Sequence, residues 1–204
     1  MQRKFSPKLK IVFLIFLLSM IITLISTLPV PMTTLTLPFP TPQSGNIQYP
    51  QREIVITLPQ EIRQGDKAEV LLSINTPERT FEDDLTSYFK DYHVVIETKL
   101  DLNGAVALPS GTQTQPMLQD QSIHFKWNIL SDNIGEKEGT LWVYLNLLPI
   151  SDDSPQQYAL LAKPIKIACV DFWGIAAKTL RWIGLLGGAV SACWLISLLI
   201  KKIK

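Results

Sequence analysis

Two long apolar segments lie near the ends of the chain, and alternating apolar and polar positions fill much of the region between them. Residues 11–28 follow four basic residues and contain no Asp, Glu, Lys or Arg. Residues 182–200 are followed at once by Lys201 and Lys202. At about 1.5 Å of rise per residue, each segment as a helix comes close to the ~30 Å hydrocarbon core of a bilayer. The pattern therefore predicts two transmembrane helices, at residues 11–28 and 182–200.

The charges are unevenly distributed along the chain. Residues 52–171 hold all 18 acidic residues and ten basic ones, which leaves a formal charge of −8 between basic ends. Because positive flanks stay on the cytoplasmic side, we expect basic cytoplasmic tails at residues 1–10 and 201–204 and an extracytoplasmic middle. The expected location is the inner (cytoplasmic) membrane, with the lipid bilayer as a partner. No basic patch of the kind that binds nucleic acid is present, so nucleic acid is not an expected partner.

A cleaved signal peptide is the alternative for the first apolar segment. Its basic start fits, but 18 apolar residues exceed the usual length of about 7–15, and no small-residue cleavage site follows. The chain instead continues Ser26-Thr27-Leu28-Pro29. We favour an uncleaved anchor.

Small or hydroxylated residues recur every four positions in both segments: Gly184, Gly188 and Ala192 in one, Ser19, Thr23 and Thr27 in the other. Small residues at this spacing allow two helix backbones to approach closely, and hydroxyls can bond across such an interface. The spacing predicts packing between the two helices, self-association or packing with other membrane proteins. Chance recurrence of residues common in membrane helices is the alternative.

Two connecting segments flank the middle of the chain. Residues 29–50 contain six prolines, which lack an amide donor, so we expect a Pro-rich extracytoplasmic spacer, either an extended stalk or a connector lying over the domain. Residues 171–181 are expected to form an interfacial segment with a short helix. Trp173 in this segment and Trp182 just after it suit the membrane–water boundary.

Residues 51–170 show an alternation typical of strands. Seven segments have this period: 52–58, 68–75, 93–102, 105–108, 122–130, 139–148 and 160–170. They predict an all-β sandwich of about seven strands. Asn103-Gly104 predicts a type I′ hairpin between the third and fourth segments, and Pro164 predicts an edge strand.

A resemblance to a known class of domain rests on three groups of residues. Phe125-Lys-Trp127-Asn-Ile129, then Gly135 and Gly139, then Leu141-Trp-Val143-Tyr-Leu145 resemble the last strands of immunoglobulin-like or fibronectin-III-like domains. The resemblance covers about residues 51–170 and implies an adhesive or scaffolding module. Bacterial extracytoplasmic versions often end in one membrane helix. The two cysteines do not form the inter-sheet pair of antibody domains.

Signals of chemistry are sparse. No nucleophile elbow, phosphate-binding loop or zinc-binding helix motif occurs, so no catalytic residue is predicted. His93 and His124 are the two histidines, and no third ligand is placed beside them by spacing. The acidic groups at residues 82–84 and 152–153 lack the pattern of a calcium loop. We therefore predict no metal site, no cofactor and no enzymatic activity.

Two aromatic residues form the candidate interaction site. If Leu141, Val143 and Leu145 face the core, Trp142 and Tyr144 face away from it. Exposed aromatic side chains of this kind are enriched at protein interfaces. The alternative reverses the strand and buries the two aromatic rings.

These features predict a non-enzymatic, membrane-anchored scaffold or accessory subunit that presents a β-sandwich for protein–protein interaction. The alternative function is an extracytoplasmic sensor that relays a ligand signal through partner helices, since the predicted tails are too short for a signalling domain.

Overall fold

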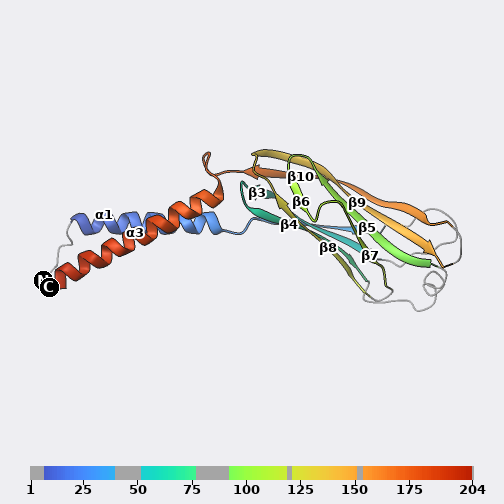
Figure 1. The fold of residues 1–204 in the computed structure, drawn as a ribbon, viewed down its shortest axis with the longest axis horizontal. Helices are drawn as coiled ribbons and strands as arrows, with labels where there is room; N and C mark the ends of the chain where they lie inside the picture. Colours follow the sequence, from blue (N-terminus) through green and yellow to red (C-terminus); the bar gives the residue numbers. More distant parts are fainter. Residues whose placement is uncertain (1–6, 40–51, 77–91, 119–120, 151–153, 204) are drawn as a thin grey trace. The chain divides into compact units, whose positions relative to one another are not determined.

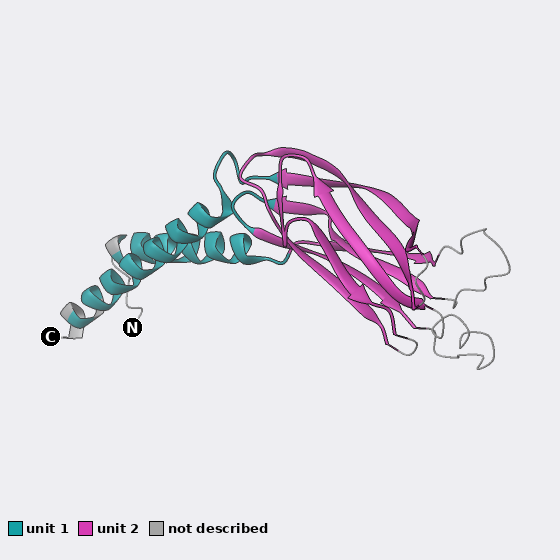
Figure 2. Ribbon diagram, turned by 45° about the vertical axis from the view of Figure 1, so that its right-hand side comes forward, with its two compact units in different colours: residues 1–29, 63–66, 170–204 teal, residues 30–62, 67–169 magenta. Residues whose placement is uncertain are grey.

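The computed structural model describes the chain in five stretches: residues 7–39, 52–76, 92–118, 121–150 and 154–203 (Figure 1). The chain divides into two compact units (Figure 2). Unit 1 comprises residues 1–29, 63–66 and 170–204, and unit 2 comprises residues 30–62 and 67–169.

Two apolar helices, one near each end of the chain, dominate unit 1. Helix α1 covers Pro7–Thr27 and helix α3 covers Ala177–Ile203. Pro7 suits the first helical position, where its missing N–H removes no helical bond, and Pro29 disfavours helical backbone at Leu28. The helices pack against each other and run antiparallel (Figure 1). Both are longer than the predicted spans, and α3 takes in residues 177–181, which we expected to be interfacial.

Two antiparallel sheets make up the strand structure. The first has five strands, in the order β1 (Met32–Pro38), β2 (Glu53–Pro59), β4 (Lys67–Asn75), β8 (Ile123–Leu130) and β6 (Val106–Leu108). The second also has five, in the order β3 (Glu61–Arg63), β10 (Gln156–Val170), β9 (Gly135–Pro149), β5 (Tyr92–Leu102) and β7 (Thr112–Pro116).

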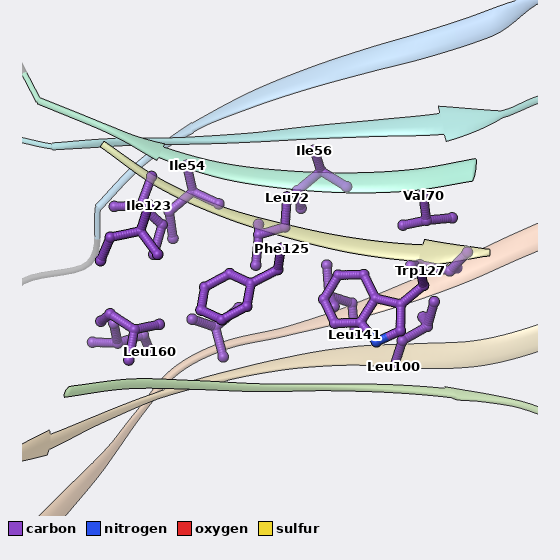
Figure 3. Close-up of a cluster of buried hydrophobic side chains, with 14 of the residues drawn as sticks. Ile54, Ile56, Val70, Leu72, Leu100, Ile123, Phe125, Trp127, Leu141 and Leu160 are labelled. Carbon is purple, nitrogen blue, oxygen red and sulfur yellow. The ribbon is translucent and has the colours of Figure 1, made fainter. Parts of the chain in front are cut away.

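One hydrophobic core joins the inner faces of the two sheets. Figure 3 shows side chains such as Phe125 and Trp127 from the first sheet together with Leu100 and Leu141 from the second. Trp127 and Leu141 are completely buried. The alternation in the sequence produces this core, because every second side chain of a strand faces the same side of its sheet. The prediction of a two-sheet β-domain with apolar helices near both ends is confirmed.

The predicted number of strands is wrong. Each of the seven predicted segments overlaps a strand, but the described residues contain ten strands. The additional ones are β1, β3 and β7. Strands β3 and β7 are short, and β7 carries no apolar alternation.

Strand β1 also differs from the expected spacer. Residues 32–38 pair with β2 along their whole length, and Pro38 stands at the end of the strand. Since β1 is an edge strand, prolines at its ends remove no central ladder bond. Residues 40–50 of the predicted spacer lie outside the described residues.

The predicted hairpin at Asn103-Gly104 is wrong. Strand β5 lies in the second sheet and pairs with β9 and β7, whereas β6 lies in the first sheet and pairs with β8. Gly104 has a positive φ of 73°, but among the described residues Trp173 is the one non-glycine with positive φ, so Asn103 does not adopt the type I′ geometry. The turn instead carries the chain from one sheet to the other.

Candidate functional site

Strand β9 places the two aromatic side chains of the candidate site on its outer face. Leu141, Val143 and Leu145 are completely buried, while Trp142 and Tyr144 point the opposite way and are half-buried. Their rings are nearly parallel, with 6.1 Å between centroids and 8° between planes. The alternative orientation of this strand, with both aromatic rings in the core, is not observed. A role of this pair in binding stays a prediction.

Strand β10 places small side chains directly opposite the two rings. On β10, the residues opposite Trp142 and Tyr144 are Ala162 and Ala159, both exposed. A methyl group is the largest side chain that β10 sets directly beside either ring. Neither ring therefore has a large side chain of β10 directly opposite it.

Polar side chains line the other side of the pair, on β5. Lys99 is opposite Trp142 and Glu97 is opposite Tyr144. The Glu97 carboxylate accepts hydrogen bonds from Asn146 Nδ2 at 2.8 Å and from Gln157 Nε2 at 3.5 Å. Lys99 Nζ donates to Asp101 Oδ2 at 3.3 Å. We call the outer face formed by Trp142, Tyr144 and these polar residues the aromatic face.

A second charged pair lies farther along the same side of the sheet. Lys166 of β10 and Glu138 of β9 are exposed and form an ion pair. The hydrogen bond to Glu138, together with its negative charge, raises the pKa of Lys166 above its usual value. Both residues lie on the surface, so the pair adds little to stability.

Glycines of α3 allow the two helices to approach closely. A Cβ built on Gly184 would lie 2.3 Å from Thr23 Oγ1 and 3.1 Å from Thr23 N, and one on Gly187 would lie 2.7 Å from Ser19 Oγ. A Cβ on Gly188 would meet Ser19 Cβ at 3.9 Å, an ordinary contact. Among these three glycines, Gly184 and Gly187 lie closest to α1, and Gly188 leaves room for a methyl group.

The predicted spacing of four residues does not describe the contact stripe. The buried small residues of the two helices recur every seven positions: Ala177, Gly184 and Ser191 on α3, and Ser19 and Ser26 on α1. Thr27 is exposed, and Ala192 is half-buried. An α-helix has about 3.6 residues per turn, so steps of four rotate away from the contact by roughly 40° each. A seven-residue repeat stays on it.

Three hydroxyl groups on the two helices bond to backbone oxygens of their own helices. Thr23 Oγ1 donates to Ser19 O at 2.9 Å, Thr27 Oγ1 donates to Thr23 O at 3.0 Å, and Ser191 Oγ donates to Gly187 O at 2.6 Å. These bonds satisfy polar groups that would be costly to leave unpaired in lipid. Thr23 and Thr27 thus bond within α1, whereas the sequence had suggested that their hydroxyls can bond across the interface.

A turn at residues 63–66, which the sequence analysis did not single out, reaches the end of α1 within unit 1. The Asp66 N–H donates to Arg63 O at 2.9 Å. Arg63 is 8% exposed, and its guanidinium donates to Ser26 O at 3.2 Å and lies 5.4 Å from the centroid of the Phe172 ring. Because α1 has no basic residue in its last turn, Arg63 supplies the positive charge that favours a helix carboxyl end.

The same turn reaches α3. The Asp66 carboxylate pairs with Arg181 in the second turn of α3, and a Cβ on Gly65 would lie 3.9 Å from Lys178 Cβ. Helix α3 has no acidic residue in its first turn. The dipeptide Gly65-Asp66 is typical of a turn. No local sequence pattern indicates its contacts with α3, because those residues lie more than a hundred positions away.

The pairing of Asp66 with Arg181 gives a testable coupling. We expect Asp66→Asn and Arg181→Met to show a coupling free energy of about 1 kcal/mol in a double-mutant cycle, because both side chains are partly shielded from water. The measurement is unfolding of the full chain in mixed micelles with increasing dodecyl sulfate. Lys178→Met removes the same charge one turn earlier and is expected to show no coupling with Asp66→Asn. Equal coupling in both cycles would contradict a specific pair.

The predicted interfacial helix at residues 171–181 is not formed over its first part. Phe172 and Ile175 exchange two backbone hydrogen bonds of 3.0 Å, which close a tight turn at Trp173 and Gly174. Both turn residues have positive φ, 53° and 79°. A β-type turn here leaves Trp173 95% exposed, and Trp182 on α3 is 58% exposed. Their placement at a membrane interface stays a prediction.

The other candidate residues do not assemble into a site. His93 lies on β5 of the second sheet and His124 on β8 of the first, where its Nδ1 lies 2.9 Å from Ser73 Oγ. Within the described stretches, no group of three or more His, Cys, Asp or Glu is placed to hold a metal ion. Cys169 and Cys193 are free thiols. The acidic groups at residues 82–84 and 152–153 lie outside the described residues.

Comparisons with known proteins give only distant structural likenesses. No family model matches the chain, and no curated protein matches it. A chain from the complex of zinc 2-glycoprotein and prolactin inducible protein of human seminal plasma aligns with 62% of this chain and 100% of its own, at 12% identity and a TM-score of 0.38. AggA, the major subunit of aggregative adherence fimbriae type I of Escherichia coli, aligns over 71% and 97%, at 11% identity and a TM-score of 0.32. At these scores neither likeness bears on function.

Proposed function

We propose that this chain is a non-enzymatic bacterial membrane protein that presents an immunoglobulin-like β-sandwich outside the cytoplasmic membrane and binds a protein partner there. It acts as a scaffold or accessory subunit. The observation that carries the proposal is the aromatic face, where Trp142 and Tyr144 stand parallel on the outside of the second sheet. Aromatic side chains with a partly open ring and polar neighbours are typical anchors of protein interfaces.

The two helices support the membrane part of the proposal. Both are long and apolar enough to cross a membrane, and only 17% of each apolar window is buried. A core helix of a soluble protein would be mostly covered by its own chain. Large apolar side chains point outward all along both helices, for example Leu14, Leu24, Leu186 and Val190. Such a surface fits lipid as its solvent.

The contact between the helices supports an uncleaved first segment. Removal of α1 would uncover Gly184 and Ser191, two buried small residues of α3. The antiparallel arrangement also puts the start of α1 and the end of α3 on one side, where basic residues of both tails favour the cytoplasm.

The proposal is tested by a double substitution on the aromatic face. We expect Trp142→Ala with Tyr144→Ala to leave the domain folded and to lower recovery of a partner from membranes in mild detergent by about tenfold or more, because buried aromatic anchors typically contribute 2 kcal/mol or more each. The readouts are quantitative mass spectrometry of the purified full chain and its near-ultraviolet circular dichroism.

A matched control lies on the other sheet. Glu69→Ala with Lys126→Ala removes two exposed, ion-paired side chains from the outer face of the first sheet. Partner recovery should be unchanged in this variant. Equal recovery in both double variants would refute the role of the aromatic face.

A further inference from the structure

Glu97 carries a charge on the aromatic face that the described residues do not neutralise. Its half-buried carboxylate accepts hydrogen bonds from two neutral amides, those of Asn146 and Gln157. No described cation lies within ion-pair distance of it. By contrast, Asp101 and Glu138 on the same side of the sheet each pair with a lysine. Glu97 is therefore able to accept a cation from outside.

The aromatic rings next to Glu97 favour the same kind of ligand. Glu97 and Tyr144 are directly opposite in the antiparallel β5–β9 pair, where Cβ atoms lie about 4.5–5.5 Å apart. The faces of Tyr and Trp rings attract cations through their quadrupole. Lys99, the cation opposite Trp142, is already engaged by Asp101. A carboxylate and two parallel rings thus converge on one patch.

The overall charge of the middle of the chain agrees with a basic partner. Residues 52–171 carry a formal charge of −8, so a partner surface with positive charge is attracted at long range. The patch itself favours arginine over lysine. A guanidinium stacks flat on an aromatic ring while its edge donates to a carboxylate, which an ammonium group does not do.

We infer that the partner inserts an arginine side chain into the aromatic face, with the guanidinium stacked on Trp142 or Tyr144 and hydrogen-bonded to Glu97. This inference rests on the proposed function and specifies the chemistry of the partner. The occupant is a protein segment that presents arginine from a basic surface, and Ala159 and Ala162 leave space beside the rings for its aliphatic stem.

The test uses fluorine NMR on the full chain labelled with 5-fluorotryptophan in micelles. The Trp142 resonance is identified by its loss in Trp142→Phe. The probes are N-acetyl-arginine amide and the neutral, nearly isosteric N-acetyl-citrulline amide. We expect the arginine probe to shift the Trp142 resonance saturably and the citrulline probe to leave it in place. Glu97→Gln should weaken arginine binding about tenfold, the size of a charge-assisted contact of ~1.4 kcal/mol.

Glu138→Gln is the matched control, because it removes one negative charge from the same side of the sheet at a residue paired with Lys166. It should change binding less than twofold. An unmoved Trp142 resonance, an equal response to citrulline, or equal weakening in both variants would overturn the inference. Loss of the partner in the Trp142/Tyr144 double variant with no arginine response would overturn the inference and keep the proposed function. A saturable arginine response, together with unchanged partner recovery in the Trp142/Tyr144 double variant, would support the arginine site and overturn its role in partner binding.

Discussion

Replacing Gly139 by alanine is expected to destabilise the β-domain, and the loss is expected to exceed that of Gly184→Ala or Gly188→Ala in the helix pair. A Cβ at this position would lie 1.9 Å from the backbone oxygen of Asp101 and 2.8 Å from Leu102 Cα. Gly139 pairs with Leu102 on β5 and with Ile165 on β10, so neighbouring strands enclose it on both sides. Backbone atoms cannot rotate away as a side chain can. We expect a loss of about 3 kcal/mol, the upper range for overpacking.

The measurement is denaturant unfolding of the full chain in micelles, followed by near-ultraviolet circular dichroism. Thr140→Ala is the matched control, because Thr140 is the next residue and lies half-buried on the outer side of the same strand. It should cost less than about 1 kcal/mol, the span of strand propensities. Equal denaturant midpoints for the two variants would contradict the predicted clash and would show that β5 and β9 move apart at little cost in free energy.

The second large effect is expected in the helix pair. Gly184→Ala adds a methyl group 2.3 Å from Thr23 Oγ1 and 3.1 Å from Thr23 N, which forces the backbones of α1 and α3 apart. Association in lipid depends on close packing rather than on exclusion of water, so separation of the backbones removes much of the stabilisation. We expect a loss of about 2 kcal/mol in the free energy of unfolding by dodecyl sulfate.

Gly188→Ala provides a control in the same helix, since its Cβ would make only a 3.9 Å contact with Ser19 Cβ. It should change the stability by less than about 0.5 kcal/mol. Adding Thr23→Ala to Gly184→Ala removes the nearest clashing atom and should restore part of the loss. If Gly188→Ala were as harmful as Gly184→Ala, the helices would pack through a different stripe.

Much of the strand pattern could be predicted because it depends on short-range periodicity. Trp142 and Tyr144 point outward since their neighbours Leu141, Val143 and Leu145 enter the core, and this follows from alternation alone. Sheet membership could not be predicted in the same way. Asn103-Gly104 has the composition of a hairpin turn, yet the chain changes sheets there, because pairing of β6 with β8 depends on residues about twenty positions later.

The candidate site shows the same division. Trp142 and Tyr144 were identified from one strand, but Glu97 was not, since its position beside Tyr144 depends on the register of β5 against β9. The spacing of small residues indicated helix packing but selected Thr27 and Ala192 in place of Ser26 and Ser191. Steps of four residues rotate by roughly 40° around a helix, and which residues then meet the other helix depends on how the pair packs.

The sequence by itself determined the two apolar helices, the faces of the main strands and the acidic middle between basic ends. These depend on which side chains avoid water and on spacings within a few residues. The tertiary structure alone decided which glycines meet α1, which sheet each strand joins and how the turn at residues 63–66 meets both helices. Such contacts join residues far apart in the chain, and their free energy depends on distances that exist only after folding.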